Sequence, residues 1–303
     1  MRIYPSDKSR KTKNSSLLIN FTIKKAQITI HKTLPASPKK SMFNIFKKKK
    51  KLIDPTERKP KTILCIPGNW DNRTEIVTSI ATNNLNEFIF AGMILLNVKT
   101  NKGFELEICE IDDNIKNSFK WLGFINQPSD DFLNKLDKLK YVIYISAKTG
   151  NLDNAKNIAE AGNAILKSGG IGIKVETINK AFTKEDWNKL SSNFTEANMY
   201  EMFVRESRMD KQGIPYTYTC GMHNLGFKDS IVYDEELKLS IDLLSFFNLY
   251  QLIDNPEIQK GQTFSSDLKS PIFKITERKK GIYTGYDTFE NPYGIWELKK
   301  ASR

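Results

Sequence analysis

The chain is poor in the residues from which most catalytic and metal centres are built. Its 303 residues include two histidines, His31 and His223, and three widely spaced cysteines, Cys65, Cys109 and Cys220. With one histidine outside the N-terminal segment, a zinc site made by several histidines of one chain is excluded. No CxxC pair occurs, so neither a disulfide framework nor a metal site is predicted, and a reducing, cytoplasmic compartment is favoured.

The sequence also lacks a long apolar run and a phosphate-binding loop. Its longest apolar run, 88–96, is far shorter than the roughly 20 residues that cross a bilayer. GGIG (169–172) follows a predicted helix and precedes a strand, the reverse of a dinucleotide-binding turn, so it is interpreted as a helix cap. SAKTGN (146–151) and PGNWDNR (67–73) each hold one glycine and are interpreted as strand-to-helix turns. No cofactor is therefore predicted.

The excess of positive over negative charge is confined to the N-terminal segment. Residues 1–61 hold 18 Lys and Arg against 3 Asp and Glu, whereas 62–303 hold 29 against 32. The body therefore has a slightly negative balance, and we expect it not to bind nucleic acid. Any such binding would depend on the basic segment.

Residues 1–61 are predicted to be a disordered basic leader, because they are rich in Lys, Ser and Asn and hold too few apolar side chains to offset the entropy of ordering. Within the leader, SMFNIFKKKKKL (41–52) has the pattern of a second start, which makes Met42 a candidate true start. A weak, reversible contact of Met42–Lys51 with an anionic membrane is an alternative. A solvated basic run is the commoner case.

Residues 62–303 are predicted to form a single α+β domain with a mixed sheet and packed helices, and the best internal seam lies near 128–131. One βαβ unit is expected from strand 141–147, helix 151–170 and strand 171–178, with a parallel strand pair. Further strands are expected over 62–70, 200–208, 215–227, 270–278, 281–289 and 294–300. Further helices are expected after Asn72, over 114–122 and 130–139, after Thr183 and over 235–253.

Residues 87–98 are apolar on both faces, which predicts a central strand. Residues 104–111 alternate apolar and acidic side chains after the turn TNKG, which predicts a half-exposed hairpin partner for that strand.

Two groups of residues support an alternative function as a hydrolase or transferase. Cys220 and His223 share the stretch TCGMHNLGF, but at a spacing of three on a strand they point to opposite faces unless Gly221 introduces a bulge. No neighbouring residue is nominated to orient His223. The acidic stretch EICEIDD (107–113) is the second group, although solvated acids and a helix N-cap are its ordinary interpretation.

Aromatic side chains at breaks in structure point instead to a contact surface. Trp70 follows a Pro-Gly-Asn turn, where it is either a contact residue or packed under the following helix. Tyr293 and Trp296 flank Gly294 near the C-terminus. Exposed loop aromatics commonly anchor binding surfaces. We therefore predict that Asn69, Trp70, Tyr293 and Trp296 contribute to a binding surface, with Trp296 partly buried.

Four stretches, CIPGNWDNRTEIVTSI (65–80), FIFAGMILLN (88–97), GMHNLGF (221–227) and NPYGIWEL (291–298), resemble a bacterial family, domain-of-unknown-function family 4261. The resemblance covers most of 62–303, fits Met42 as the start, and implies no activity or residue roles. The sequence thus favours a non-catalytic cytoplasmic binding or interaction protein, immunity-like by analogy with similar bacterial families, with a protein or small ligand as partner.

Overall fold

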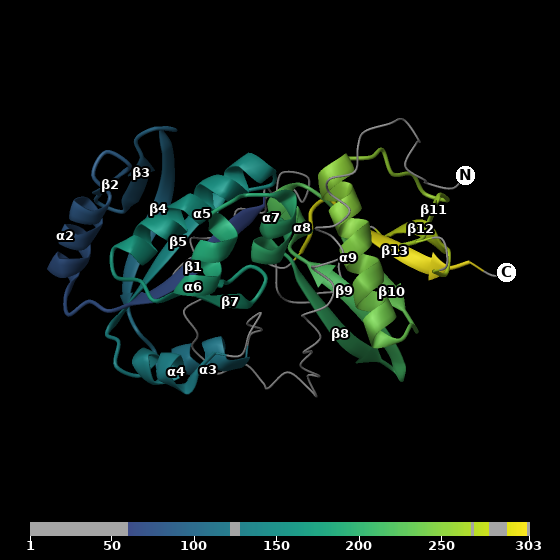
Figure 1. Ribbon diagram of the computed structural model, residues 1–303, viewed down its shortest axis with the longest axis horizontal. Coiled ribbons are helices and arrows are strands. Elements are labelled where there is room, and N and C mark those ends of the chain that lie inside the picture. Colours follow the sequence, from purple (N-terminus) through teal and green to yellow (C-terminus); the bar gives the residue numbers. More distant parts are fainter. Residues whose placement is uncertain (1–59, 122–127, 268–269, 279–289, 302–303) are drawn as a thin grey trace, which may run out of the picture.

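The computed structural model describes residues 60–121, 128–267, 270–278 and 290–301 (Figure 1). Residues 1–59 of the leader, with the Met42–Lys51 membrane contact, and the strand expected over 281–289 lie outside these residues, whereas Lys61 at the end of the predicted leader begins the first strand. The described chain has the predicted α+β class, because helices pack on two separate sheets that lie side by side along the long axis of the molecule.

The first sheet has seven strands in the order β2-β3-β4-β5-β1-β6-β7, and each strand is antiparallel to its neighbours. The two long inner strands, β1 and β5, are apolar on both faces, which suits burial under two helical layers. The strands are β1 (Lys61–Gly68), β2 (Phe88–Ala91), β3 (Ile94–Asn97), β4 (Lys102–Glu110), β5 (Tyr141–Lys148), β6 (Gly172–Val175) and β7 (Lys180–Thr183).

Helices cover both faces of the first sheet. Alternation along β1 places Leu64 and Ile66 in one core and Cys65 in the other. The first core is closed by α2 (Arg73–Asn83), α5 (Leu152–Lys167) and α6 (Lys184–Ser191), and the second by α3 (Ile115–Trp121) and α4 (Asp130–Leu136).

The βαβ unit is present as a split unit. Strands β5 and β6 flank β1, which is antiparallel to both, so the two strands run in the same direction without bonding each other. The parallel pair expected inside this unit is therefore wrong. The small residues of α5 do bring it close to the sheet, since a Cβ on Gly162 would lie 2.9 Å from Ile173 Cδ1.

Residues 87–98 form an edge hairpin, so the predicted central strand is wrong. Gly92 has a φ of +65° and turns the chain between β2 and β3, which pair from Phe88↔Asn97 to Ala91↔Ile94. The hairpin partnership of 104–111 is confirmed, because β4 pairs with β3. In Figure 1, the hairpin and α2 lie at the end of the molecule farthest from the second sheet.

The second sheet has six strands in the order β11-β12-β13-β10-β9-β8, and its β10–β13 pair is parallel. The chain reaches it through α7 (Glu196–Phe203) and covers one face with α9 (Leu237–Asp254), while the one-turn helix α8 (Met222–Leu225) joins β9 to β10. The strands are β8 (Arg205–Lys211), β9 (Ile214–Cys220), β10 (Asp229–Tyr233), β11 (Thr263–Phe264), β12 (Phe273–Arg278) and β13 (Ile295–Lys300).

Two strand predictions in this region need correction. Thr195 caps α7 by accepting a hydrogen bond from Asn198 N at 3.2 Å, so the chain is helical to Phe203 and the strand expected over 200–208 begins only at Arg205. The strand expected over 215–227 ends at Cys220, where α8 follows.

The two sheets share one core, which includes Ile66 of β1 together with Tyr218 of β9 and Ile231 of β10. Trp187 of α6 is fully buried and packs its ring edge against Phe182 of β7 and Phe203 of α7, at centroid distances of 5.4 and 6.2 Å. The seam predicted near 128–131 falls at Ser129, which caps α4 beneath the first sheet. Across the described ranges, none of the helices combines the length and apolar character needed to span a membrane.

Candidate functional site

The cluster around His223 is formed by a sharp reversal between β9 and β10. Gly221 (φ +119°) and Gly226 (φ +96°) bracket α8 in the left-handed region, which residues with a Cβ rarely adopt. This reversal removes the strand geometry assumed for Cys220 and His223, because one ends β9 and the other lies in α8.

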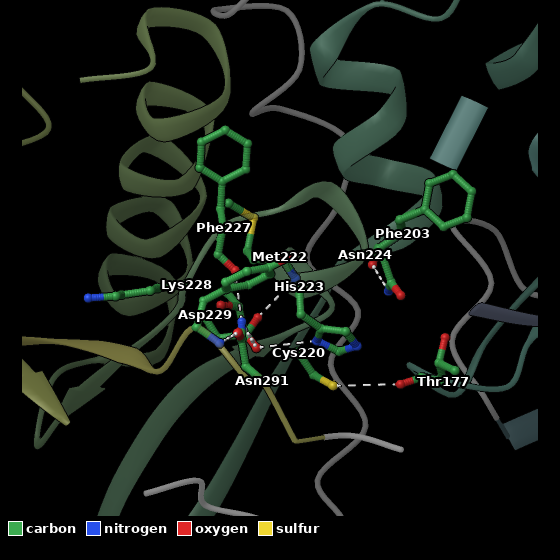
Figure 2. A network of polar contacts seen from close by, with 12 residues as sticks. Thr177, Phe203, Cys220, Met222, His223, Asn224, Phe227, Lys228, Asp229 and Asn291 are labelled. Carbon is green, nitrogen blue, oxygen red and sulfur yellow. Dashed lines mark hydrogen bonds and ion pairs between the residues drawn. The ribbon is translucent and has the colours of Figure 1, made fainter. Parts of the chain in front are cut away.

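A buried carboxylate holds the reversal in place. Asp229, at the start of β10, accepts hydrogen bonds from Met222 N at 3.0 Å and from Asn291 Nδ2 at 2.8 Å (Figure 2). Asn291 Nδ2 also donates to Phe227 O at 2.9 Å. Asp229 therefore ties α8 to the segment that leads into β13.

The imidazole of His223 lies beside this carboxylate but forms no hydrogen bond with it. His223 Nδ1 is 3.8 Å from Asp229 Oδ2, too far for a hydrogen bond, and Nδ1 has no partner within the described residues. Both side chains are almost fully buried. Asp229 is the neighbouring group that the sequence did not nominate.

The thiol of Cys220 contacts a backbone carbonyl of the first sheet's core. Its Sγ lies 3.9 Å from Thr177 O, and Figure 2 draws this contact on the side of the cluster opposite Asp229. Cys220 is 4% exposed and His223 is 2% exposed. A catalytic nucleophile needs an approach for its substrate, so the burial of Cys220 and His223 is typical of a packed core.

Polar contacts link this cluster to the first sheet. Thr62 of β1 donates to Asn224 Oδ1 at 2.8 Å, and Asn224 Nδ2 donates to Phe203 O at 3.3 Å. Gly150 N donates to Asn224 O at 3.0 Å. The helix α8 thus connects the two sheets through buried hydrogen bonds, a structural role that explains its burial.

Two surface hollows of the described residues lie away from this cluster. One, with a volume of about 450 Å³, opens between β4, β5 and the start of α5, and a second adjoins it. Lys102 lines both, while an ion pair of 2.8 Å between Lys61 and Glu105 lies in the first. Neither hollow is lined by a residue of the His223 cluster.

The acidic stretch 107–113 is dispersed rather than gathered. Asp112 Oδ1 accepts from Asn114 N at 2.9 Å at the start of α3, and Glu110, Asp112 and Asp113 are exposed. Within the described ranges, no three His, Cys, Asp or Glu side chains are grouped closely enough to hold a metal ion.

The aromatic residues expected to form a binding surface do not share one. Trp70 is 3% exposed, and its Nε1 donates to Ser168 O at 2.7 Å beyond the end of β1. Tyr293 is 39% exposed, and its hydroxyl donates to Gly150 O at 3.4 Å, near the start of β1. Since an eight-residue strand is about 26 Å long, the two rings are far apart.

The other two residues of the expected surface, Asn69 and Trp296, differ in their exposure to solvent. Asn69 is exposed beside the buried Trp70. Trp296 is 7% exposed on β13, with Lys228 Nζ 4.0 Å from its ring centroid. The burial expected for Trp296 is confirmed, whereas the exposed position expected for Trp70 is wrong because its indole packs into the core.

An exposed apolar surface occurs instead at the end formed by α2 and the β2–β3 hairpin, called the hairpin end below. Ten large apolar side chains are exposed in the described chain, and six of them lie between residues 77 and 98. The sequence interpretation assigned part of this stretch to the core. The six that define the hairpin end are Val77, Leu85, Ile89, Met93, Ile94 and Val98.

Comparison of the chain with protein-family models, curated proteins and solved structures finds no match. The resemblance to the family of unknown function therefore stays an expectation from the sequence.

Two of the three cysteines have thiols that resist ionisation. Burial raises the pKa of Cys65 well above its ordinary value, and Glu176 raises it further. Partial burial, together with the nearby Glu107, raises the pKa of Cys109 to about 11. The thiolate is the nucleophilic form, so neither residue has the character of an activated cysteine.

We expect the native protein to react slowly with a disulfide reagent such as Ellman's reagent at neutral pH. With a pKa of about 11, about 0.1% of Cys109 is thiolate at pH 8, so its reaction rate should rise about tenfold per pH unit towards pH 10. Stopped-flow absorbance on the native protein measures this, with protein in denaturant as the fast control. Rapid labelling of one native thiol at pH 7 would contradict the assignment.

Proposed function

We propose that this protein acts by contact with a protein partner rather than by catalysis, and that the hairpin end is its contact surface. The observation that supports this is the grouping of large exposed apolar side chains at one end of the molecule. Ile89 and Ile94 lie on the hairpin face turned away from α2, since Phe88 and Leu95 pack on the α2 side. Exposed apolar side chains gathered at one end of a protein are typical of interaction sites.

The charge distribution along the sequence supports the same surface. Residues 76–98 contain one charged residue, Glu87, although 27% of the whole chain is charged. Depletion of charge together with enrichment of apolar side chains is typical of the core of a protein interface. A solvated helix-and-hairpin surface would instead carry mixed charges.

The alternative, a hydrolase or transferase using Cys220 and His223 or the acidic stretch 107–113, has less support. The thiol contacts Thr177 O, the imidazole is buried, and the acids of the stretch are spread along the surface. Cytoplasmic location and the lack of nucleic-acid binding by the body remain part of the proposal, on the charge and cysteine arguments above.

A genetic replacement distinguishes the two functions. In cells lacking the native protein, Ile89→Lys should reproduce the deletion phenotype, because it places a charge in the apolar surface. Ile214→Lys is the matched control, since Ile214 is 51% exposed on the second sheet and Ile89 is 53% exposed. Neither variant should shift the melting temperature by more than about 2 °C, because both positions are exposed.

A third variant, His223→Gln, directly tests the alternative that the protein is an enzyme using His223. We expect the fraction of this variant that remains folded to keep its function. A folded His223→Gln protein with no function, together with a fully functional Ile89→Lys protein, would overturn the proposal in favour of catalysis.

A further inference from the structure

The outer edge of β2 is open for pairing. Val98 N donates to Glu87 O, so Glu87 and Val98 form a hydrogen-bonded pair of the antiparallel hairpin. Hydrogen-bonded and non-hydrogen-bonded pairs alternate along such a hairpin, so the backbone N–H and C=O groups of Phe88 and Phe90 point away from β3. Phe88 N donates to Asn84 O at 3.0 Å, which leaves the Phe90 N–H and C=O without a partner among the described residues. The first sheet therefore ends in an edge that is closed by the turn before β2 at Phe88 and is open to another strand at Phe90.

Nothing in β2 protects this edge. Natural edge strands usually carry a lysine, a proline or a bulge that prevents pairing with another chain. The four residues of β2 are Phe, Ile, Phe and Ala, and they pair with β3 in an unbroken register. An unguarded edge next to exposed apolar side chains is a surface for strand addition.

The near absence of charge at this edge suits pairing with a second copy of the same chain. A surface that binds a charged partner carries the opposite charge, whereas a surface that meets its own copy has to be nearly neutral, because like charges would face each other. The single charge in 76–98, Glu87, lies 3.5 Å from Lys167 and 4.0 Å from Lys99 of the same chain. Homodimer interfaces are also more apolar than transient interfaces between different proteins.

We propose that two copies of the chain associate by antiparallel pairing of β2 with β2 across a two-fold axis at Phe90. The Phe90 N–H and C=O then exchange both hydrogen bonds with the same residue of the second copy. In this register Ile89 lies opposite Ala91 of the second copy, and the two seven-stranded sheets become continuous. The inference rests on the proposed function, since it names the partner of the same surface.

Sedimentation equilibrium of the full chain tests the pairing. The wild-type protein should sediment as a dimer, and Ile89→Lys should raise the dimer dissociation constant about 100-fold or more, because the two-fold axis introduces two buried lysines. Ala91→Lys, on the same exposed face of β2, should act in the same way. Ile214→Lys should leave the dissociation constant unchanged.

The outcomes separate this inference from the proposed function. A wild-type protein that is monomeric at about 100 µM, a concentration at which even weak dimers form, overturns the pairing. So does a dimer that both lysine variants leave intact. If the wild-type protein is monomeric but Ile89→Lys still abolishes function in cells, the contact function stands with a different partner. A wild-type monomer and a functional Ile89→Lys protein together overturn both.

Discussion

Replacing Gly221 with alanine is expected to leave little folded protein at 37 °C. The φ of Gly221 is +119°, and a Cβ at this position would lie 2.0 Å from Phe203 O and 2.6 Å from Ile178 Cγ2. The nearest atom belongs to the backbone at the end of α7, so no side-chain rotation relieves the contact. We expect a loss above about 4 kcal/mol, a large part of the 5–15 kcal/mol that stabilises a typical domain.

Gly213→Ala is the matched control for this effect. Gly213 also has a positive φ, +81°, but an added Cβ meets no atom within 4 Å. It should therefore show only the strain of the left-handed conformation, about 1 kcal/mol. Denaturant unfolding followed by circular dichroism measures both losses. Equal losses in the two variants would mean that α7 and α8 are not packed as closely as the structure indicates.

Replacing Trp70 with alanine is expected to cost about 3–5 kcal/mol of unfolding free energy, the usual range for a buried tryptophan. The indole lies against the backbone of Gly68 and Gly169, where an added Cβ would come within 2.2 and 2.6 Å of its atoms. Its Nε1 donates to Ser168 O, so the ring fastens the end of β1 to the end of α5. The residue is thus a structural element rather than a binding one.

Two further variants separate the contributions of Trp70. Trp70→Phe retains much of the apolar contact and loses the hydrogen bond, so it should cost about 1–2 kcal/mol. Tyr293→Ala, which removes an aromatic that is 39% exposed, should cost less than Trp70→Ala. Guanidinium unfolding monitored by circular dichroism ranks the three. A Trp70→Ala protein as stable as the wild type would instead support the prediction that Trp70 is an exposed loop residue of a binding surface.

Local signals in the sequence were reliable where a few neighbouring residues determine the structure. Asn72 was predicted to open a helix, and its Oδ1 accepts from Glu75 N at 3.0 Å. Thr183 was predicted in the same way, and its hydroxyl accepts from Asp186 N at 3.1 Å. Capping depends on residues three apart, so the chain itself holds all the information needed.

The position of a strand within its sheet could not be predicted from the sequence. The apolar run 87–98 fits a central strand and an exposed edge hairpin equally well, because periodicity reports which faces are apolar and not which of them finds a partner. Only the order of the strands places β2 at the edge of its sheet.

The surroundings of His223 were unpredictable for a related reason. Asp229 lies in none of the helices or strands expected from the sequence, and Asn291 lies 62 residues beyond it. The sequence does hold a signal, since two glycines bracket residues 222–225, but the strand was expected to run on to 227 and only a bulge at Gly221 was considered. Contacts between distant segments of a chain leave no fixed spacing in its sequence.

The strand order of the second sheet has a consequence for synthesis on the ribosome. Strand β13 sits between β12 and β10, yet it is the last of the six to be made. Until β13 emerges, the strands β8, β9 and β10 cannot be joined by hydrogen bonds to β11 and β12. The apolar side of α9 then has only part of the sheet face on which it packs. The first sheet is complete more than 100 residues earlier. Nascent chains should therefore fold in two stages, with the second half open to proteases and chaperones until the final strand is inserted.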